Sequence, residues 1–142
     1  FLAKSFATTI SPWIVTMDAL EPFKVEAPQQ DPKPFDYLQK DGKNSYDIKL
    51  EAAIKPKKQK QTVVSETNYK YNYWTMNQQL AHQTINGCNV RSGDLYGSGT
   101  ISGPKEGTYG SMLELTTAGS KPIKLNDGSE RKFINDGDTV IL

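Results

Sequence analysis

The sequence has little of the chemistry from which disulfide scaffolds and zinc sites are built. It contains one cysteine, Cys88, and one histidine, His82. A lone cysteine cannot form an internal disulfide, so we expect a reducing, cytoplasmic compartment. A structural zinc site needs four ligands, of which these two residues supply at most two. No Gly-x-Ser-x-Gly elbow accompanies His82 to indicate a catalytic triad, and we expect a structural or surface role for it.

Long apolar runs and a strong charge of one sign are also absent. The apolar pair Ile14-Val15 is followed by Thr16 and Asp18, and no segment approaches the roughly 20 apolar residues of a transmembrane helix. No pattern of a secretory leader is present. The 142 residues carry a net charge of +1, which favours neither a disordered chain nor a nucleic-acid binder. We therefore expect a soluble domain, or a piece of one, that binds no nucleic acid and no membrane.

What the sequence does contain is a series of strand patterns. Apolar and polar residues alternate from Tyr46 to Ile54, which predicts a strand with one buried face. The polar run 55–60 and the β-branched run Thr62–Ser65 complete a predicted hairpin. Aromatic and β-branched residues predict a strand over Pro12–Thr16. Short apolar segments between turn residues predict further strands at 112–117, 122–125, 132–134 and 139–142.

Only one helix of any length is predicted. Asn72 can cap its start, apolar residues then recur at helical spacing, and Asn86-Gly87 can end it, so we place it over about Tyr73–Ile85. A single short turn is expected around Asp18–Glu21, within the proline-rich stretch 18–44. The predicted fold class is therefore mainly β, with one short helix.

The glycine-rich segment Leu95–Ser102 is a candidate site on a predicted strand. Gly97 and Gly99 weaken a strand, unless a ligand or another backbone approaches closely there. The segment lacks the Gly-Lys-Ser/Thr ending and the following helix of a phosphate loop. A nucleotide site is therefore not favoured.

Three further features each have two interpretations. The aromatic run 69–74 could stack bases or sugars, although at the start of a helix such a run more often packs into a core. Lys4 with Thr8 could stabilise an oxyanion, or could form an ordinary polar edge. Glu114 lies between two leucines of a predicted strand, so its carboxylate would face away from them as an exposed glutamate does.

Several short motifs follow one another in order over almost the whole chain. They are KSFATTISPWIV at 4–15, MDAL at 17–20, DPKP at 31–34, YWTMNQQL at 73–80, NGCN at 86–89, SGTISG at 98–103, GSMLEL at 110–115 and DGD at 136–138. Together they resemble the C-terminal catalytic domain of the fumarylacetoacetate hydrolase family. The resemblance implies a mixed β-roll and identifies residues 1–142 as part of that domain. We expect the N-terminal domain, an upstream metal-site segment and the closing strands to lie outside this chain.

The resemblance also implies an enzyme. The family hydrolyses a carbon–carbon bond of fumarylacetoacetate, giving fumarate and acetoacetate in the breakdown of tyrosine and phenylalanine. A divalent cation, Ca²⁺ or Mg²⁺, is expected to be held by upstream carboxylates and to chelate the substrate, a small diketo acid, while a histidine deprotonates the attacking water. For the full-length protein we expect a cytoplasmic homodimer.

Four residues take roles from the resemblance. Lys4 matches a catalytic lysine beside the metal and the oxyanion, and Thr8 matches the neighbouring threonine of the metal site. Thr100 matches a threonine that contacts the substrate. Glu114 matches the catalytic glutamate that orients the histidine. Ala7 stands where the motif has glycine, and its methyl group could crowd the metal site.

Two hypotheses of different classes follow. The first is a piece of a metal-dependent carbon–carbon hydrolase. Because the family's catalytic histidine, metal carboxylates and substrate arginine have no counterparts in these residues, we expect the isolated chain to be inactive. The second is a non-catalytic, β-rich binding or structural module on the same scaffold. A histidine and a Glu-x-Glu pair upstream of position 1 would support the enzyme.

Overall fold

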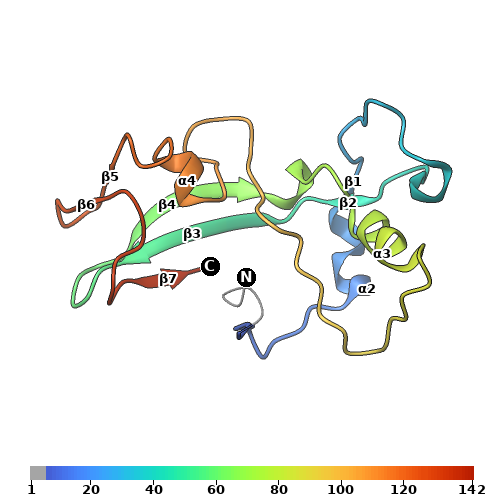
Figure 1. Ribbon diagram of the computed structural model, residues 1–142, viewed down its shortest axis with the longest axis horizontal. Helices are drawn as coiled ribbons and strands as arrows, with labels where there is room; N and C mark the ends of the chain where they lie inside the picture. Colours follow the sequence, from blue (N-terminus) through green and yellow to red (C-terminus); the bar gives the residue numbers. More distant parts are fainter. Residues whose placement is uncertain (1–5) are drawn as a thin grey trace.

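The centre of the molecule is a three-stranded antiparallel sheet, seen in a computed structural model that describes residues 6–142 (Figure 1). The long strand β3 (Lys49–Lys55) pairs with β4 (Thr62–Asn68), with a bulge between Ala52 and Ala53. On its other side β3 pairs with β7 (Thr139–Ile141), so the order is β4-β3-β7. The predicted hairpin and the predicted C-terminal strand are therefore confirmed.

Two small sheets lie at opposite ends of the molecule (Figure 1). At one end β1 (Lys24–Val25) pairs with β2 (Ser45–Tyr46). At the other end β5 (Ile123–Lys124) pairs with β6 (Glu130–Arg131). Gly128 between β5 and β6 has a φ of +84°, the left-handed conformation that the Asp-Gly pair predicts for a tight turn. The strand expected at 132–134 lies instead at 130–131, and the mainly β class is confirmed.

Helices are short but more numerous than predicted. They comprise α2 (Met17–Leu20), α3 (Met76–Thr84) and α4 (Met112–Leu115), together with 3₁₀ turns at Glu21–Phe23, Asp36–Leu38 and Tyr69–Tyr71. The helix predicted over 73–85 is α3, which begins later because its cap is Thr75 rather than Asn72. Thr75 Oγ1 accepts from the backbone N–H of Gln78, and Gln78 Oε1 accepts from the N–H of Thr75, which is a complete capping box.

Three predicted strands are wrong. Residues 12–16 have no partner strand among the described residues, and Trp13 and Ile14 remain 85% and 87% exposed. Residues 95–102 form a loop because Gly97 and Gly99 supply no side chain to pack, and Gly99 has a φ of +75°. In the segment 112–117, residues 112–115 instead form α4. Short apolar runs do not by themselves distinguish a strand from a helical turn.

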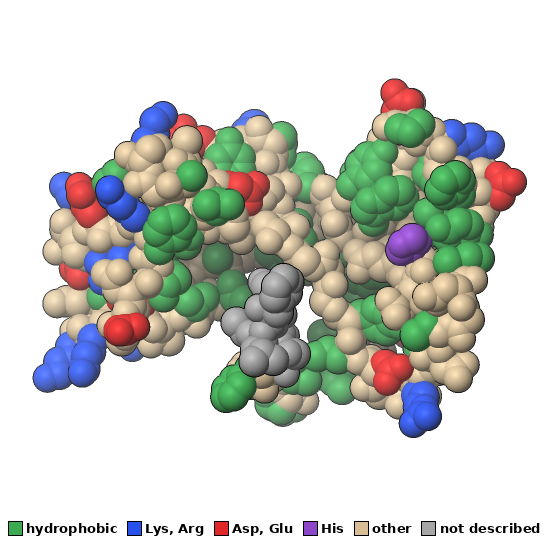
Figure 2. All heavy atoms as spheres, viewed as in Figure 1, with side chains coloured by type: hydrophobic (Ala, Val, Ile, Leu, Met, Phe, Trp, Pro, Cys, Tyr) green, Lys and Arg blue, Asp and Glu red, His purple; other side chains and the backbone are tan. Residues whose placement is uncertain are grey.

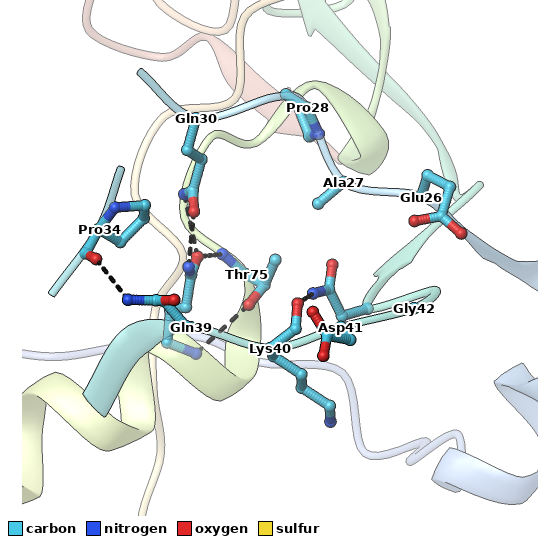
Figure 3. A pocket seen from close by; sticks show the side chains of 12 residues that line it. Glu26, Ala27, Pro28, Gln30, Pro34, Gln39, Lys40, Asp41, Gly42 and Thr75 are labelled. Atoms are coloured by element: carbon cyan, nitrogen blue, oxygen red, sulfur yellow. Dashed lines mark hydrogen bonds between the residues drawn. The ribbon is translucent and has the colours of Figure 1, made fainter. Parts of the chain in front are cut away.

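A buried amide network ties the proline-rich segment to α3 (Figure 3). Gln78, which is 5% exposed, donates from Nε2 to Gln30 Oε1 at 2.7 Å and to the backbone oxygen of Leu38 at 2.9 Å. Gln30 Nε2 donates to the backbone oxygen of Tyr73 at 2.8 Å. A segment with few regular hydrogen bonds is thus held by side-chain amides, next to an open polar hollow lined by residues of 26–44 and α3.

The apolar core is small. Its buried members are Leu38, Tyr46, Ala53, Ile54, Tyr69 and Leu125. Of the aromatic run 69–74, Tyr69 packs in the core, whereas Tyr71, Tyr73 and Trp74 are exposed, so the core interpretation holds for Tyr69 alone. Within the described residues, no helix has the length and the apolar composition needed to cross a bilayer.

Candidate functional site

A closed loop on the edge of β4 positions the candidate site. The backbone N–H of Gly103 donates to the carbonyl oxygen of Thr108 at 2.8 Å. The backbone N–H of Glu66, in β4, donates to the carbonyl oxygen of Gly107 at 3.0 Å. Gly103 is buried, and a Cβ on it would lie 2.7 Å from Thr108 Oγ1 and 3.2 Å from Thr67 Oγ1. The loop 103–108 is therefore packed tightly against the sheet, which fixes Thr100–Ser102 before it and α4 after it.

Glycine at position 110 lets the segment that precedes α4 pack closely on Thr100 and Ile101. A Cβ on Gly110 would lie 2.5 Å from the Ile101 carbonyl oxygen and 2.8 Å from Thr100 Cγ2. Real Cβ atoms do not approach backbone oxygens this closely, so only glycine permits the contact. Because α4 begins two residues later, Thr100 and Glu114 lie on adjoining segments.

The Glu114 carboxylate is held by two serine hydroxyls. Ser102 Oγ donates to Oε1 at 2.8 Å and to Oε2 at 2.9 Å, and Ser111 Oγ donates to Oε2 at 2.7 Å. Ser102 Oγ also accepts from the Gly110 N–H at 3.0 Å. The side chain of Glu114 is exposed, so the carboxylate is oriented and still accessible to a further donor.

The prediction that Glu114 projects from a strand is wrong, because it lies in the first turn of α4. Ser111 caps this helix by accepting from the Glu114 N–H at 3.3 Å. The spacing Ser111-x-x-Glu114 is that of a capping box, and this signal could have identified the helix. No comparable local signal marks Ser102, whose bond to Glu114 spans the whole loop. Sequence reasoning therefore missed Ser102, Ser111 and Gly110.

Of the other two expected site residues, Thr8 and Lys4, the structure describes only Thr8. Thr8 is described and exposed, and it makes no hydrogen bond to Thr100 or Glu114 within residues 6–142. Lys4 lies outside the described residues. The association of Lys4 and Thr8 with the site therefore stays a prediction.

A divalent cation such as Ca²⁺ or Mg²⁺ would need several oxygen ligands, carboxylates among them. Within residues 6–142, no three carboxylate, imidazole or thiol groups gather closely enough to hold a metal ion. Glu114 is already bonded by Ser102 and Ser111. The donor set of the described part of the chain therefore does not by itself fit Ca²⁺ or Mg²⁺.

His82 lies on the surface of α3, beside an aromatic groove (Figure 2). Its Nδ1 is 3.0 Å from the Tyr37 hydroxyl, and the two rings stack with centroids 6.3 Å apart. Phe35 also stacks with Tyr37, with ring centroids 6.1 Å apart. The groove has a volume of about 890 Å³ and extends from these rings to Gly97 and Gly99. Thr100 and Glu114 do not line it.

The fold and this site define a class: a mainly β domain that presents an oriented, accessible carboxylate beside a hydroxyl-bearing loop. The chain belongs to the fumarylacetoacetate hydrolase family, since the model of that family's C-terminal domain matches residues 1–142.

Curated relatives match along the whole chain. It is 59% identical over 145 residues to the fumarylacetoacetase of Dictyostelium discoideum, covering 34% of that protein. The fumarylacetoacetase of Oryza sativa subsp. japonica is 55% identical over 143 residues, and that of Homo sapiens 54% identical over 143 residues. In both cases the match includes 100% of this chain. The chain thus spans about a third of the length of the curated relatives it matches.

Proposed function

We propose that this chain is part of a fumarylacetoacetase, a hydrolase that cleaves a carbon–carbon bond of fumarylacetoacetate to give fumarate and acetoacetate. The observation that carries the proposal is the orientation of the Glu114 carboxylate by two serine hydroxyls, on a helix whose preceding residue Gly110 packs closely on Thr100 and Ile101. It is supported by 51–59% identity to curated fumarylacetoacetases along the chain.

The reaction needs a base, a stabilised oxyanion and a stabilised carbanion. Water adds to the fumaryl carbonyl carbon, and one of its protons passes to the base. The carbon–carbon bond then breaks, its electron pair goes to the methylene carbon that lies between the two carbonyl groups of the substrate, and protonation makes that carbon the methyl group of acetoacetate. A carboxylate that accepts a hydrogen bond from an imidazole fixes its tautomer and favours the imidazolium that forms. This is the role that we propose for Glu114.

The remaining roles follow the same proposal. The Thr100 hydroxyl binds the diketo acid, and Thr8 and Lys4 contribute a hydroxyl and an ammonium group near the oxyanion. A divalent cation, Ca²⁺ or Mg²⁺, would supply Lewis-acid stabilisation when bound. We assign its carboxylate ligands and the catalytic imidazole to the part of the relatives' length that this chain does not cover. We also propose that the full-length protein is a homodimer in the cytoplasm.

The experiment is a hydrolysis assay on the complete enzyme, with fumarate and acetoacetate measured as products. The first variant is Thr100→Val, which preserves the shape of the side chain and deletes the hydroxyl. Loss of one neutral hydrogen bond should lower kcat/KM about three- to tenfold with little change in folding stability.

Thr84→Val is the matched control, because the Thr84 hydroxyl bonds only to backbone oxygens of α3. Its kcat/KM should equal that of the unmodified enzyme. An unmodified protein without turnover would refute the proposed function and favour a non-catalytic module. An unchanged kcat/KM in Thr100→Val would remove Thr100 from the substrate site.

A further inference from the structure

Ser102 is bonded in a way that suits it to control Glu114. Its hydroxyl accepts from the Gly110 N–H at 3.0 Å and donates to the two carboxylate oxygens at 2.8 Å and 2.9 Å. One side chain thus joins the end of the loop to the carboxylate on α4. Ser102 is half-buried, whereas Glu114 is exposed. The more buried side chain thus donates to the more exposed one.

Glu114 is the third residue of α4 but does not bond back to the N–H of the helix cap. In a capping box the third residue bonds back to the N–H of the cap, as Gln78 does to Thr75 in α3. In α4 only the forward half of that arrangement is present, the bond from the Glu114 N–H to Ser111. The carboxylate instead accepts from Ser102 and Ser111. The hydroxyls therefore determine where the carboxylate points.

The two oxygens of the carboxylate are not equivalent. The Ser102 hydroxyl donates a bifurcated hydrogen bond to both oxygens. Oε2 also accepts from Ser111, whereas Oε1 has no further donor among the described residues. Each carboxylate oxygen can accept about two hydrogen bonds. Oε1 therefore retains the greater capacity for a further donor, and it is the oxygen that Ser102 alone contacts.

We propose that Ser102 is a positioning residue, which aims Oε1 of Glu114 at the imidazole of the catalytic base. This inference rests on the proposed function. Without the Ser102 hydroxyl, Glu114 keeps its bond to Ser111, but its carboxylate can rotate about that single contact. The imidazole would then meet a misaligned acceptor, and small misplacements of this kind cost large factors in rate.

The test compares Ser102→Ala with the unmodified complete enzyme, using fumarylacetoacetate as substrate. We expect kcat to fall about tenfold, the scale of losses when a residue that orients a reactive group is removed, with KM within twofold. The acidic limb of the pH profile of kcat/KM should move to lower pH, because the imidazolium loses part of its stabilisation. Ser102→Cys keeps the size and a weaker donor, so its kcat should lie between the two.

A double variant separates this role from a structural one. Since Ser102 acts through Glu114, adding Ser102→Ala to Glu114→Gln should reduce kcat no further than about twofold. Ser120→Ala is the matched control, because it removes a serine hydroxyl that bonds only to the Thr117 oxygen just beyond α4. Its kcat, KM and pH profile should not change.

The outcomes are distinct. A full additional tenfold loss in the double variant, or a Ser102→Ala enzyme with an unmoved acidic limb, would overturn the inference while leaving the proposed function intact. The same holds if Ser102→Cys is as slow as Ser102→Ala and both melt at lower temperature. An unmodified enzyme without turnover would overturn both proposals.

Discussion

At the scale of single residues, the candidate site depends on hydroxyl groups. Ser102 and Ser111 hold both oxygens of Glu114 at 2.7–2.9 Å. Hydrogen bonds to an ionised group are short and strong compared with neutral ones, so two of them can restrict a flexible side chain. Gly110 allows the close packing because it has no side chain: a Cβ there would clash with the carbonyl oxygen of Ile101 and with Thr100 Cγ2. Orientation of one carboxylate thus depends on three small residues around it.

Glu114→Gln preserves the size of the side chain and removes its charge. If the carboxylate stabilises an imidazolium, the pKa of the base falls and the acidic limb of the kcat/KM profile moves to lower pH. The rate constant kcat should fall roughly 10²-fold, at the lower end of what general-base catalysis contributes. Steady-state kinetics of the complete enzyme from acidic to neutral pH measures both effects. An unmoved limb at full rate would remove Glu114 from the site.

At the scale of elements, capping determines the ends of the helices. Thr75 is 2% exposed and completes a capping box with Gln78, whose amide also bonds to Gln30 and Leu38. The start of α3 therefore anchors the proline-rich segment as well as the helix. By contrast, Thr16 caps the four-residue helix α2 with a single bond of 3.4 Å at the surface. Threonine is therefore expected to stabilise the fold more at the α3 cap than at the α2 cap.

Replacing Thr75 by alanine should lower the free energy of unfolding by about 1–2 kcal/mol, the upper part of the range for lost helix caps. Thr16→Ala is the comparison, and its effect should be no more than about 0.5 kcal/mol, as for an exposed position. Chemical denaturation of both variants, followed by circular dichroism, gives the two values. Equal decreases in the free energy of unfolding for the two variants would show that the buried α3 cap stabilises the fold no more than the exposed α2 cap.

At the scale of the whole molecule, aspartates in the connections between strands accept hydrogen bonds from nearby residues. Arg131 of β6 donates to both Asp138 oxygens, at 2.7 Å and 3.0 Å, and the Asp138 side chain is only 3% exposed. These bonds hold the pKa of Asp138 below its ordinary value. Hydrogen bonds from Asn68 and Ser129 lower the pKa values of Asp47 and Asp127 in the same way. All three favour the folded state when ionised.

Stability should therefore fall with acidification. A carboxylate whose folded-state pKa is depressed stabilises the fold above its unfolded value, about 3.9 for aspartate. That contribution is lost as the pH falls from about 4 through the lower folded-state pKa. Asp138→Asn should be less stable than the unmodified chain at neutral pH, and the difference should shrink below pH 4. Thermal melts from pH 7 to pH 2 measure this.

Asp41→Asn serves as the control for that series. Asp41 is an exposed carboxylate outside the ion pairs of the described residues, and its replacement should leave the acid dependence unchanged. A constant difference between Asp138→Asn and the unmodified chain at every pH would contradict the assignment to the Arg131 pair.

The isolated 142-residue chain should not hydrolyse fumarylacetoacetate, with or without added Ca²⁺ or Mg²⁺. Its one imidazole, His82, contacts Tyr37 and not Glu114, and residues 6–142 bring together no three carboxylate, imidazole or thiol groups that could hold a metal ion. Product assays on the chain alone, with the complete enzyme as positive control, test this expectation. Turnover by the chain alone would show that the base and the cation ligands have been wrongly assigned.

Local patterns in the sequence determined the central hairpin and its turns. The alternation from Tyr46 to Ile54 and the β-branched run that follows predict β3 and β4, because a strand needs only a period of two and a nearby partner. The Asp-Gly pair predicts the β5–β6 turn for a similarly local reason, since glycine readily adopts a positive φ. The ordered motifs carried the family resemblance over the whole chain.

Only the tertiary structure decided which segments meet. The pairing of β7 with β3 and the bond from Ser102 to Glu114 both join residues that are separated in sequence. Such contacts depend on how the loop closes over β4 and on the absence of a side chain at Gly110. Neither periodicity nor propensity contains that information. For this reason Thr100 and Glu114 could be proposed from the motifs of the sequence, whereas the contact of the Ser102 hydroxyl with Glu114 could not.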